Sequence, residues 1–133
     1  MSNNIVPKPT DAELKILQVL WEYGPSSVRF VNDKLNEEKE VGYTTTLKIM
    51  QIMAEKGLLQ RNTDNRSHIY NPVLKKVDTQ KQLLQDFVDS TFKGSAMELV
   101  MQALGNHQAS SQELQEIKAL IANIEGKQPK IDE

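Results

Sequence analysis

The spacing of apolar residues along this chain changes at Gly57 from a helical to an extended period. Before this glycine, apolar residues recur every three or four positions in three successive segments, which is the spacing of amphipathic helices. After it, residues 58–62 and 67–71 form two short extended segments around the polar turn Thr63-Asp64-Asn65, and Pro72 follows the second. The pattern predicts three helices followed directly by a β-hairpin.

Signals at the helix ends set the bounds of these three helices. Thr10 and Glu13 have the spacing of a capping box, and Gly24-Pro25 ends the first helix. Ser26 or Ser27 can cap the second helix, and the third is expected to begin near Thr44 and to end at Gly57. The residues expected to point inward are Leu14, Leu17, Leu20 and Trp21, then Val28, Val31 and Leu35, then Leu47, Met50, Met53 and Ala54.

The first turn of the third helix carries Tyr43 and three successive hydroxyls, Thr44, Thr45 and Thr46. The unpaired backbone N–H groups of a helix N-terminus already favour an anion, and hydroxyls add donors there. Thr44 is also a candidate for the N-cap of this helix. The turn therefore suits a phosphate contact as well as a simple capping role.

Charge is divided unevenly, although the chain as a whole carries −2. Residues 1–76 contain 11 Lys and Arg against 9 Asp and Glu, whereas residues 77–133 contain 5 against 9. Residues 41–76 contain six basic residues but only two acidic ones, Glu55 and Asp64. This local excess is what a phosphate backbone attracts, although charge alone fits a solvated surface equally well.

The second half, residues 77–133, reads as helical up to about Glu125. Capping boxes at Ser95 and Ser110 open the last two helices. Three broadly apolar helices cannot bury their faces within so short a segment, so we expect them to pair with a second chain; the alternative is that they fold back on the first half. The expected dimerisation residues are Leu84, Phe87, Val88, Leu114, Ile117, Ile121 and Ile124.

The order of elements predicts the fold class as mainly α with a small β-hairpin wing, that is, a winged helix-turn-helix domain with a C-terminal helical dimerisation region. The expected domains are a DNA-binding domain over 1–76, a dimerisation region over 77–125 and a disordered tail over 126–133. Winged helices also serve as protein-interaction modules that bind no DNA, and the net acidity is compatible with that alternative.

Composition excludes several other classes of protein. The chain has no cysteine, so it has no disulfide scaffold, thiolate metal site or cysteine nucleophile. Two isolated histidines, His68 and His107, match no metal-binding or catalytic motif, and we expect neither an enzyme nor a cofactor. No apolar run is long enough to span a bilayer, so we expect no membrane insertion and a cytoplasmic location.

Several short segments form a specific pattern when they are read in order. They are Pro9-Thr10-Asp11-Ala12-Glu13-Leu14-Lys15-Ile16-Leu17, Leu20-Trp21-Glu22-Tyr23-Gly24-Pro25 with Val28-Arg29, Gly42-Tyr43-Thr44-Thr45-Thr46-Leu47, Glu55-Lys56-Gly57-Leu58-Leu59 and Asn65-Arg66-Ser67-His68-Ile69-Tyr70-Asn71-Pro72. Together they resemble the penicillinase-repressor family of BlaI, MecI and CopY type, and the resemblance spans about residues 9–125.

The resemblance implies a homodimeric bacterial transcriptional repressor that binds double-stranded, palindromic operator DNA. Typical target genes of the family encode β-lactamases, penicillin-binding proteins or copper exporters. Tyr43, Thr44 and Thr45 match the family motif at the start of the recognition helix, and Arg66 matches the basic residue at the wing turn. The full set of expected DNA contacts is Tyr43, Thr44, Thr45, Thr46, Lys48, Arg61, Arg66 and His68, of which Arg61 and His68 rest on their position alone.

Two departures from the family pattern bear on regulation. Copper-responsive members use a C-terminal cysteine cluster, which this chain lacks, so copper sensing by that route is excluded. Members that respond to β-lactams are released when a membrane-sensor metalloprotease pathway leads to cleavage of an Asn-Phe bond in the dimerisation region. The bond that aligns here is Gln102-Ala103, and both residues differ.

Overall fold

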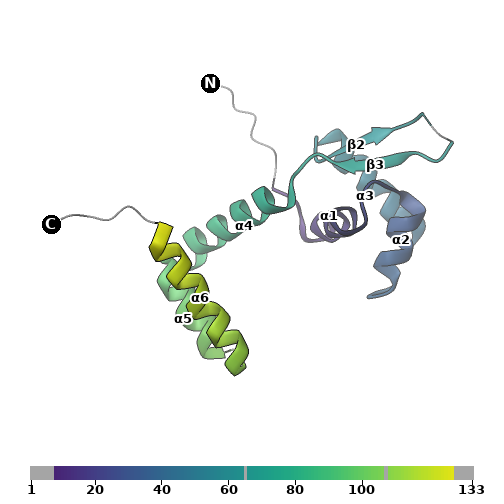
Figure 1. Ribbon diagram of the computed structural model, residues 1–133. Helices are drawn as coiled ribbons and strands as arrows, with labels where there is room; N and C mark the ends of the chain where they lie inside the picture. Colours follow the sequence, from purple (N-terminus) through teal and green to yellow (C-terminus); the bar gives the residue numbers. More distant parts are fainter. Residues whose placement is uncertain (1–7, 65, 107, 128–133) are drawn as a thin grey trace, which may run out of the picture. The chain divides into compact units, whose positions relative to one another are not determined.

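The computed structural model describes residues 8–64, 66–106 and 108–127 (Figure 1). The chain divides into two units, residues 1–84 and 85–133, and the division falls inside helix α4. The domain boundary after Lys76 stays a prediction, and Lys76 is the first residue of α4. In chain order the elements are α1 (Asp11–Tyr23), β1 (Ser26–Ser27), α2 (Val28–Asn36), α3 (Tyr43–Glu55), β2 (Leu59–Asn62), β3 (Ile69–Pro72), α4 (Lys76–Thr91), α5 (Ala96–Asn106) and α6 (Ser111–Lys127).

The ends of α1 and α2 follow the signals in the sequence. Thr10 and Glu13 form both hydrogen bonds of the capping box, and Gly24 ends α1 with a positive φ of 87°. Ser27, rather than Ser26, caps α2 by accepting a hydrogen bond from the Phe30 N–H. The predicted helix ends are thus confirmed for α1, and the choice between the two serines is settled for α2.

The hairpin belongs to a sheet of three strands in the order β1-β3-β2, with both pairs antiparallel. Arg61 lies opposite Tyr70 in the β2–β3 pair, and Ser26 lies opposite Tyr70 in the β1–β3 pair. The sequence indicates the hairpin but not β1, because a strand of two residues is too short to show any alternation. The short β1 joins the hairpin to the loop between α1 and α2.

The core of the first unit is formed by the inward faces of α1, α2 and α3 against the sheet. Its buried side chains are Ile16, Leu17, Leu20, Val28, Val31, Met50, Met53, Leu58, Leu59 and Tyr70. The Trp21 indole N–H donates a hydrogen bond of 2.9 Å to the Leu74 carbonyl, which holds the segment after β3 against α1. All these core side chains lie within the first unit, which has the winged helix-turn-helix architecture that the order of elements predicts.

The helices of the second unit keep most of their apolar side chains exposed within this chain. Ser110 and Glu113 form a complete capping box, and the Ser95 hydroxyl accepts from the Glu98 N–H. α6 extends to Lys127, which is two residues beyond the predicted end, and the rest of the predicted tail, residues 128–133, lies outside the described residues. Within residues 8–64, 66–106 and 108–127, no helix is both long and apolar enough to cross a membrane.

Candidate nucleic-acid interface

All three arginines of the chain, Arg29, Arg61 and Arg66, line one groove in the first unit. The groove has a volume of about 600 Å³ and lies between the starts of α2 and α3 and the two strands of the wing. No aspartate or glutamate is among its described lining residues, which are Ser27, Val28, Arg29, Tyr43, Leu47, Gln51, Arg61, Arg66, Ser67, His68 and Tyr70. The groove therefore concentrates positive charge that the overall charge of the chain conceals.

Arg29 and Tyr43 form the contact between α2 and α3 at this groove. The Arg29 guanidinium lies 5.2 Å from the centre of the Tyr43 ring, a cation–π distance. The Tyr43 side chain stays partly exposed, at 41%. The stacked guanidinium is held in place by an aromatic ring and not by a carboxylate, so its charge is not neutralised by this partner.

The exposed face of α3 continues from Tyr43 through Thr44, Lys48 and Gln51. Gly42, not Thr44, is the N-cap, and it makes no side-chain capping bond. The alternative that Thr44 is the N-cap is thus wrong, because the cap lies two residues earlier, at Gly42, and Thr44 is already inside the helix. The first turn contains no acidic residue, so nothing in it opposes an anion at the N-terminus.

Thr46 and Thr45 lie away from this surface. Thr46 is fully buried, and its hydroxyl accepts a hydrogen bond of 2.8 Å from the Asn32 amide. Its position one turn before Met50 places it on the core face of α3. The Thr46 side chain is therefore not accessible to DNA. Thr45 is exposed, but it lines a different pocket, which α3 forms with α1 and the loop between α2 and α3.

Asn32 and Asn36 fix the entry into α3. The Asn32 amide donates to the Val41 carbonyl at 3.0 Å as well as to Thr46, and the Asn36 amide donates to the same carbonyl at 2.9 Å. The Val41 N–H in turn donates to the Asn36 side-chain oxygen. These bonds tie the end of α2 to the start of α3, so the angle between the two helices is set by polar contacts as well as by the core.

A partly buried ion pair attaches the far end of α3 to α1. The Lys56 ammonium lies 2.7 Å from the Glu13 carboxylate, whose side chain is only 5% exposed. Burial raises the pKa of Glu13, but hydrogen bonds from Lys56 and Thr10 and the charge of Lys56 together lower it below its ordinary value. The carboxylate thus caps α1 and anchors α3 at once.

The predicted DNA contacts divide into three groups, the first being Thr45 and Thr46, which lie away from the groove. Tyr43, Arg61, Arg66 and His68 line the groove, whereas Thr44 and Lys48 are exposed on α3 outside its lining. The groove also contains Arg29, Ser27, Gln51 and Ser67, which the sequence pattern did not indicate as DNA contacts. Arg29 stands far from the wing in sequence, and only β1, which places the start of α2 beside β3, brings it to the groove.

The expected dimerisation residues are mostly exposed in the single chain. Leu84, Phe87, Leu114, Ile121 and Ile124 are 43–53% exposed, which is high for large apolar side chains. Val88 is only 5% exposed and Ile117 is half-buried, so Val88 in particular already has partners within its own chain.

Gln102 and Ala103 are both exposed and lie inside α5. Among the described residues, no cluster of three or more His, Cys, Asp or Glu side chains could hold a metal ion.

Comparisons with known proteins agree with this geometry. The sequence profile of the family described as penicillinase repressor matches residues 9–123. A penicillinase repressor of Bacillus licheniformis is 22% identical over 116 residues, which span 87% of this chain and 91% of that protein. The methicillin resistance regulatory protein MecI of Staphylococcus aureus is 19% identical over 112 residues, 84% of this chain and 91% of that protein.

A further relative and a solved structure match a shorter part of the chain. The transcriptional regulator BlaI of Mycobacterium tuberculosis is 34% identical over 64 residues, 47% of this chain and 46% of that protein. The solution structure of the DNA-binding domain of the repressor BlaI aligns with a TM-score of 0.50 at 23% identity, over 59% of this chain and 93% of that domain. The fold of the first unit is thus that of a known winged-helix domain, and the chain belongs to the penicillinase repressor family.

Proposed function

We propose that this protein is a bacterial transcriptional repressor that binds a palindromic DNA operator as a homodimer. The observation that carries the proposal is the convergence of Arg29, Arg61 and Arg66 on one groove beside the exposed start of α3. Guanidinium groups bind phosphate in a two-pronged geometry, and an unopposed helix N-terminus favours the same partner. A protein-interaction module would not need this concentration of arginines in a groove whose described lining contains no carboxylate.

In the proposed complex, α3 enters the major groove and the wing lies along the flanking backbone, as in other winged helices. Lys48 and Gln51 are the exposed side chains one and two turns into α3, within reach of base edges, whereas the arginines fix register through phosphates. Asn32 and Thr46 do not contact DNA in this complex, but their hydrogen bond holds α3 at its angle to α2. A repressor of this kind acts in the cytoplasm, where the chromosome lies.

The exposed apolar faces of α4 and α6 are the proposed dimer interface, formed by Leu84, Phe87, Leu114, Ile121 and Ile124. So many large, half-exposed apolar side chains in one small region exceed what a soluble monomer usually leaves uncovered. A single winged helix with a modest basic groove binds DNA weakly, so pairing two of them is what gives a useful affinity. Anything that loosens the dimer would then release the operator.

Salt-dependent DNA binding tests the proposed contacts. Replacing Arg66 with alanine removes one phosphate contact from each subunit, so the slope of log K against log [salt] for the dimer should fall by about 1.8, that is, about 0.9 for each of the two contacts. Lys48→Ala should lower the affinity for the specific site more than the affinity for random duplex. Lys81→Ala removes an exposed lysine from α4 and serves as the control. Unchanged salt slopes and unchanged specificity in both variants would contradict the assignment.

The link between dimerisation and DNA binding is tested with Ile121→Asp. A carboxylate in the apolar stripe of α6 should raise the dimer dissociation constant and weaken operator binding, although it lies outside the DNA-binding unit. Ala119→Asp places the same charge on the opposite face of the helix and should change neither quantity. If the Ile121 variant is monomeric and still binds operator as tightly as the unaltered protein, the coupling is wrong.

Release by proteolysis remains a prediction from the family resemblance. The Gln102–Ala103 bond is exposed but lies within the helical turns of α5. A peptidase binds its substrate in an extended form, so α5 would have to unwind locally before cleavage. Incubation with the metalloprotease of a candidate sensor pathway, followed by mass analysis of the fragments, identifies the bond that is cut.

A further inference from the structure

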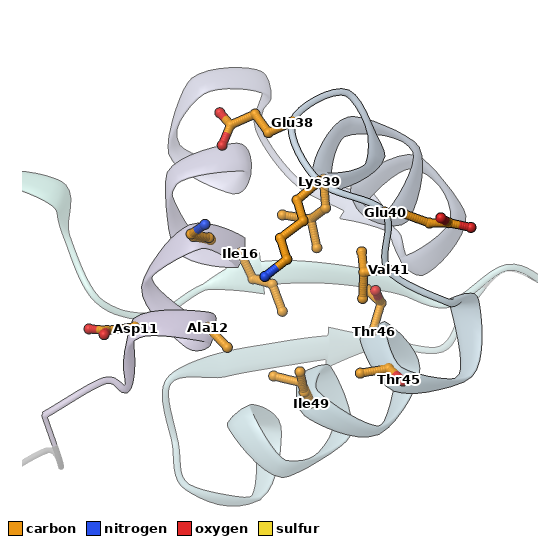
Figure 2. Close-up of a pocket in the computed structure, with 12 residues that line it drawn as sticks. Asp11, Ala12, Ile16, Glu38, Lys39, Glu40, Val41, Thr45, Thr46 and Ile49 are labelled. Carbon is orange, nitrogen blue, oxygen red and sulfur yellow. The ribbon is translucent and has the colours of Figure 1, made fainter.

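A pocket of about 360 Å³ lies in the first unit on a face of α3 that does not line the arginine groove (Figure 2). It is formed by the start of α1, the loop between α2 and α3, and the first half of α3. Its volume falls within the roughly 300–1,000 Å³ that is usual for small-molecule sites. None of its described lining residues lines the arginine groove, so it is a separate candidate site.

The pocket has an apolar floor. Ile16 from α1 and Ile49 from α3 lie at its base, and both point into the hollow in Figure 2. Ala12, Leu35 and Val41 complete the apolar lining. Because Ile16 is only 1% exposed, the apolar area that a ligand would cover comes mainly from Ala12, Leu35, Val41 and Ile49. Such a surface favours a ligand with a hydrocarbon or aromatic body, since burying it removes apolar area on both sides from water.

The charges around the mouth are arranged asymmetrically. Figure 2 shows the Lys39 side chain reaching across the mouth, with its ammonium group above the apolar floor near Ile16. The carboxylates of Asp11, Glu38 and Glu40 point outward, away from the hollow. Within the described part of the chain, the Lys39 ammonium makes no ion pair. A second lysine, Lys15 of α1, also belongs to the lining. The pocket thus combines an apolar floor with the inward-reaching ammonium of Lys39 and a second basic side chain in its wall.

We propose that this pocket binds a small monocarboxylate with an apolar body. The ligand carboxylate pairs with the Lys39 ammonium, and the apolar body lies on Ile16 and Ile49. A metal cation does not suit the site, because the three carboxylates nearby face away from it. A sugar or another strongly polar ligand does not suit the apolar floor.

A ligand held here would contact the recognition helix directly. Thr45, Thr46 and Ile49 belong both to the pocket wall and to α3, whose opposite side carries Tyr43 and Lys48. Occupation of the pocket could therefore change how α3 meets DNA, a consequence that rests on the proposed function. The binding site itself does not rest on it, because the test below contains no DNA.

The test is a titration of the full-length protein with octanoate, in which binding is monitored by calorimetry and by the NMR amide resonances of the protein. Octanamide, which has the same body without the charge, is the uncharged control. We expect saturable binding of octanoate at one site per chain, with shifts concentrated at Ile16, Val41, Thr45 and Ile49. Octanamide should bind about tenfold more weakly or worse, because it cannot form the charge-assisted contact.

Two variants locate the site. Lys39→Met keeps the approximate length of the side chain but removes its charge. It should lower the affinity for octanoate about tenfold and should not lower the affinity for octanamide. Ala12→Phe fills the mouth of the pocket from α1 and should abolish binding of both ligands. Lys81→Met removes a lysine outside the pocket and should bind octanoate like the unaltered protein.

Three results would overturn the proposal. They are the absence of saturable octanoate binding by the folded protein, equal octanoate affinity in the Lys39 variant and the unaltered protein, and resonance shifts confined to the apolar helices beyond residue 84. The last result would assign the ligand to the exposed faces of the second unit. Failure of DNA binding in a separate assay would leave the proposal standing, since no step of the titration uses DNA.

Discussion

Replacing Asn32 with alanine removes two hydrogen bonds that hold the start of α3, those to the Val41 carbonyl and to the Thr46 hydroxyl. Each bond contributes about 0.5–1.5 kcal/mol net, and a buried group left without a partner costs about 1–3 kcal/mol. Because Thr46 is fully buried and Asn32 is 9% exposed, water cannot readily replace the lost partner. We expect Asn32→Ala to lower the free energy of unfolding by about 2–4 kcal/mol.

A double-mutant cycle separates the Asn32–Thr46 bond from the other effects. Thr46→Val removes the hydroxyl with little change in shape and should cost about 1–2 kcal/mol, because it leaves the Asn32 amide with one partner. The double variant should be more stable than the sum of the single effects predicts, by about 1 kcal/mol, since neither partner is then left unpaired. Asn36→Ala, which removes bonds from an exposed side chain, is the matched control and should cost under about 1 kcal/mol.

Urea unfolding of the full-length chain, followed by circular dichroism, measures all four variants. The Asn32→Ala variant should also bind DNA with lower affinity in the absence of urea, because Asn32 no longer holds the start of α3. An Asn32 variant that loses less than about 0.5 kcal/mol, or single effects that simply add, would refute the argument that these bonds set the position of α3.

Three further predictions concern stability. Glu13→Gln should destabilise the protein by about 1–2 kcal/mol at neutral pH. Because the pKa of the Glu13 carboxyl is lowered on folding, the difference in unfolding free energy between the variant and the unaltered protein should shrink as pH falls below 4.5. Urea titrations at several pH values measure this difference. Gly57→Ala should cost about 1–2 kcal/mol, since φ at this position is 87°. Gly105→Ala should instead stabilise the protein by about 0.5–1 kcal/mol, because alanine favours the helical conformation of α5 more than glycine does. Thermal melts in which both variants shift in the same direction would contradict this contrast. Trp21→Phe should cost about 1–2 kcal/mol through loss of the hydrogen bond to the Leu74 carbonyl, and an unchanged urea midpoint would remove that role.

The elements of the first unit were predictable because their end signals are local. A capping box at Thr10, a serine cap before Val28 and a glycine at position 57 each act within one turn of the chain, so each can be read without knowing the fold. The hairpin was predictable for the same reason, from two extended segments around a polar turn. What escaped prediction was β1, whose two residues become a strand only because β3 lies beside them.

The candidate site was predictable only in part, because a groove gathers residues that are distant in sequence. Arg29 reaches the groove through the β1–β3 pairing, and no local pattern indicates that contact. Thr46 is the opposite case. Its spacing to Met50 and Met53 is that of one helix face, so the sequence already contained the signal that this threonine is buried.

The central claim is that a dimer of this chain reads a palindromic operator through α3 and the arginine groove. Selection of bound sequences from a random duplex library, with the mass of the protein and of its complex measured in solution, tests this most directly. We expect recovery of a palindrome bound by two chains. A folded protein that recovers no sequence above background would contradict it and would favour a protein-interaction module instead.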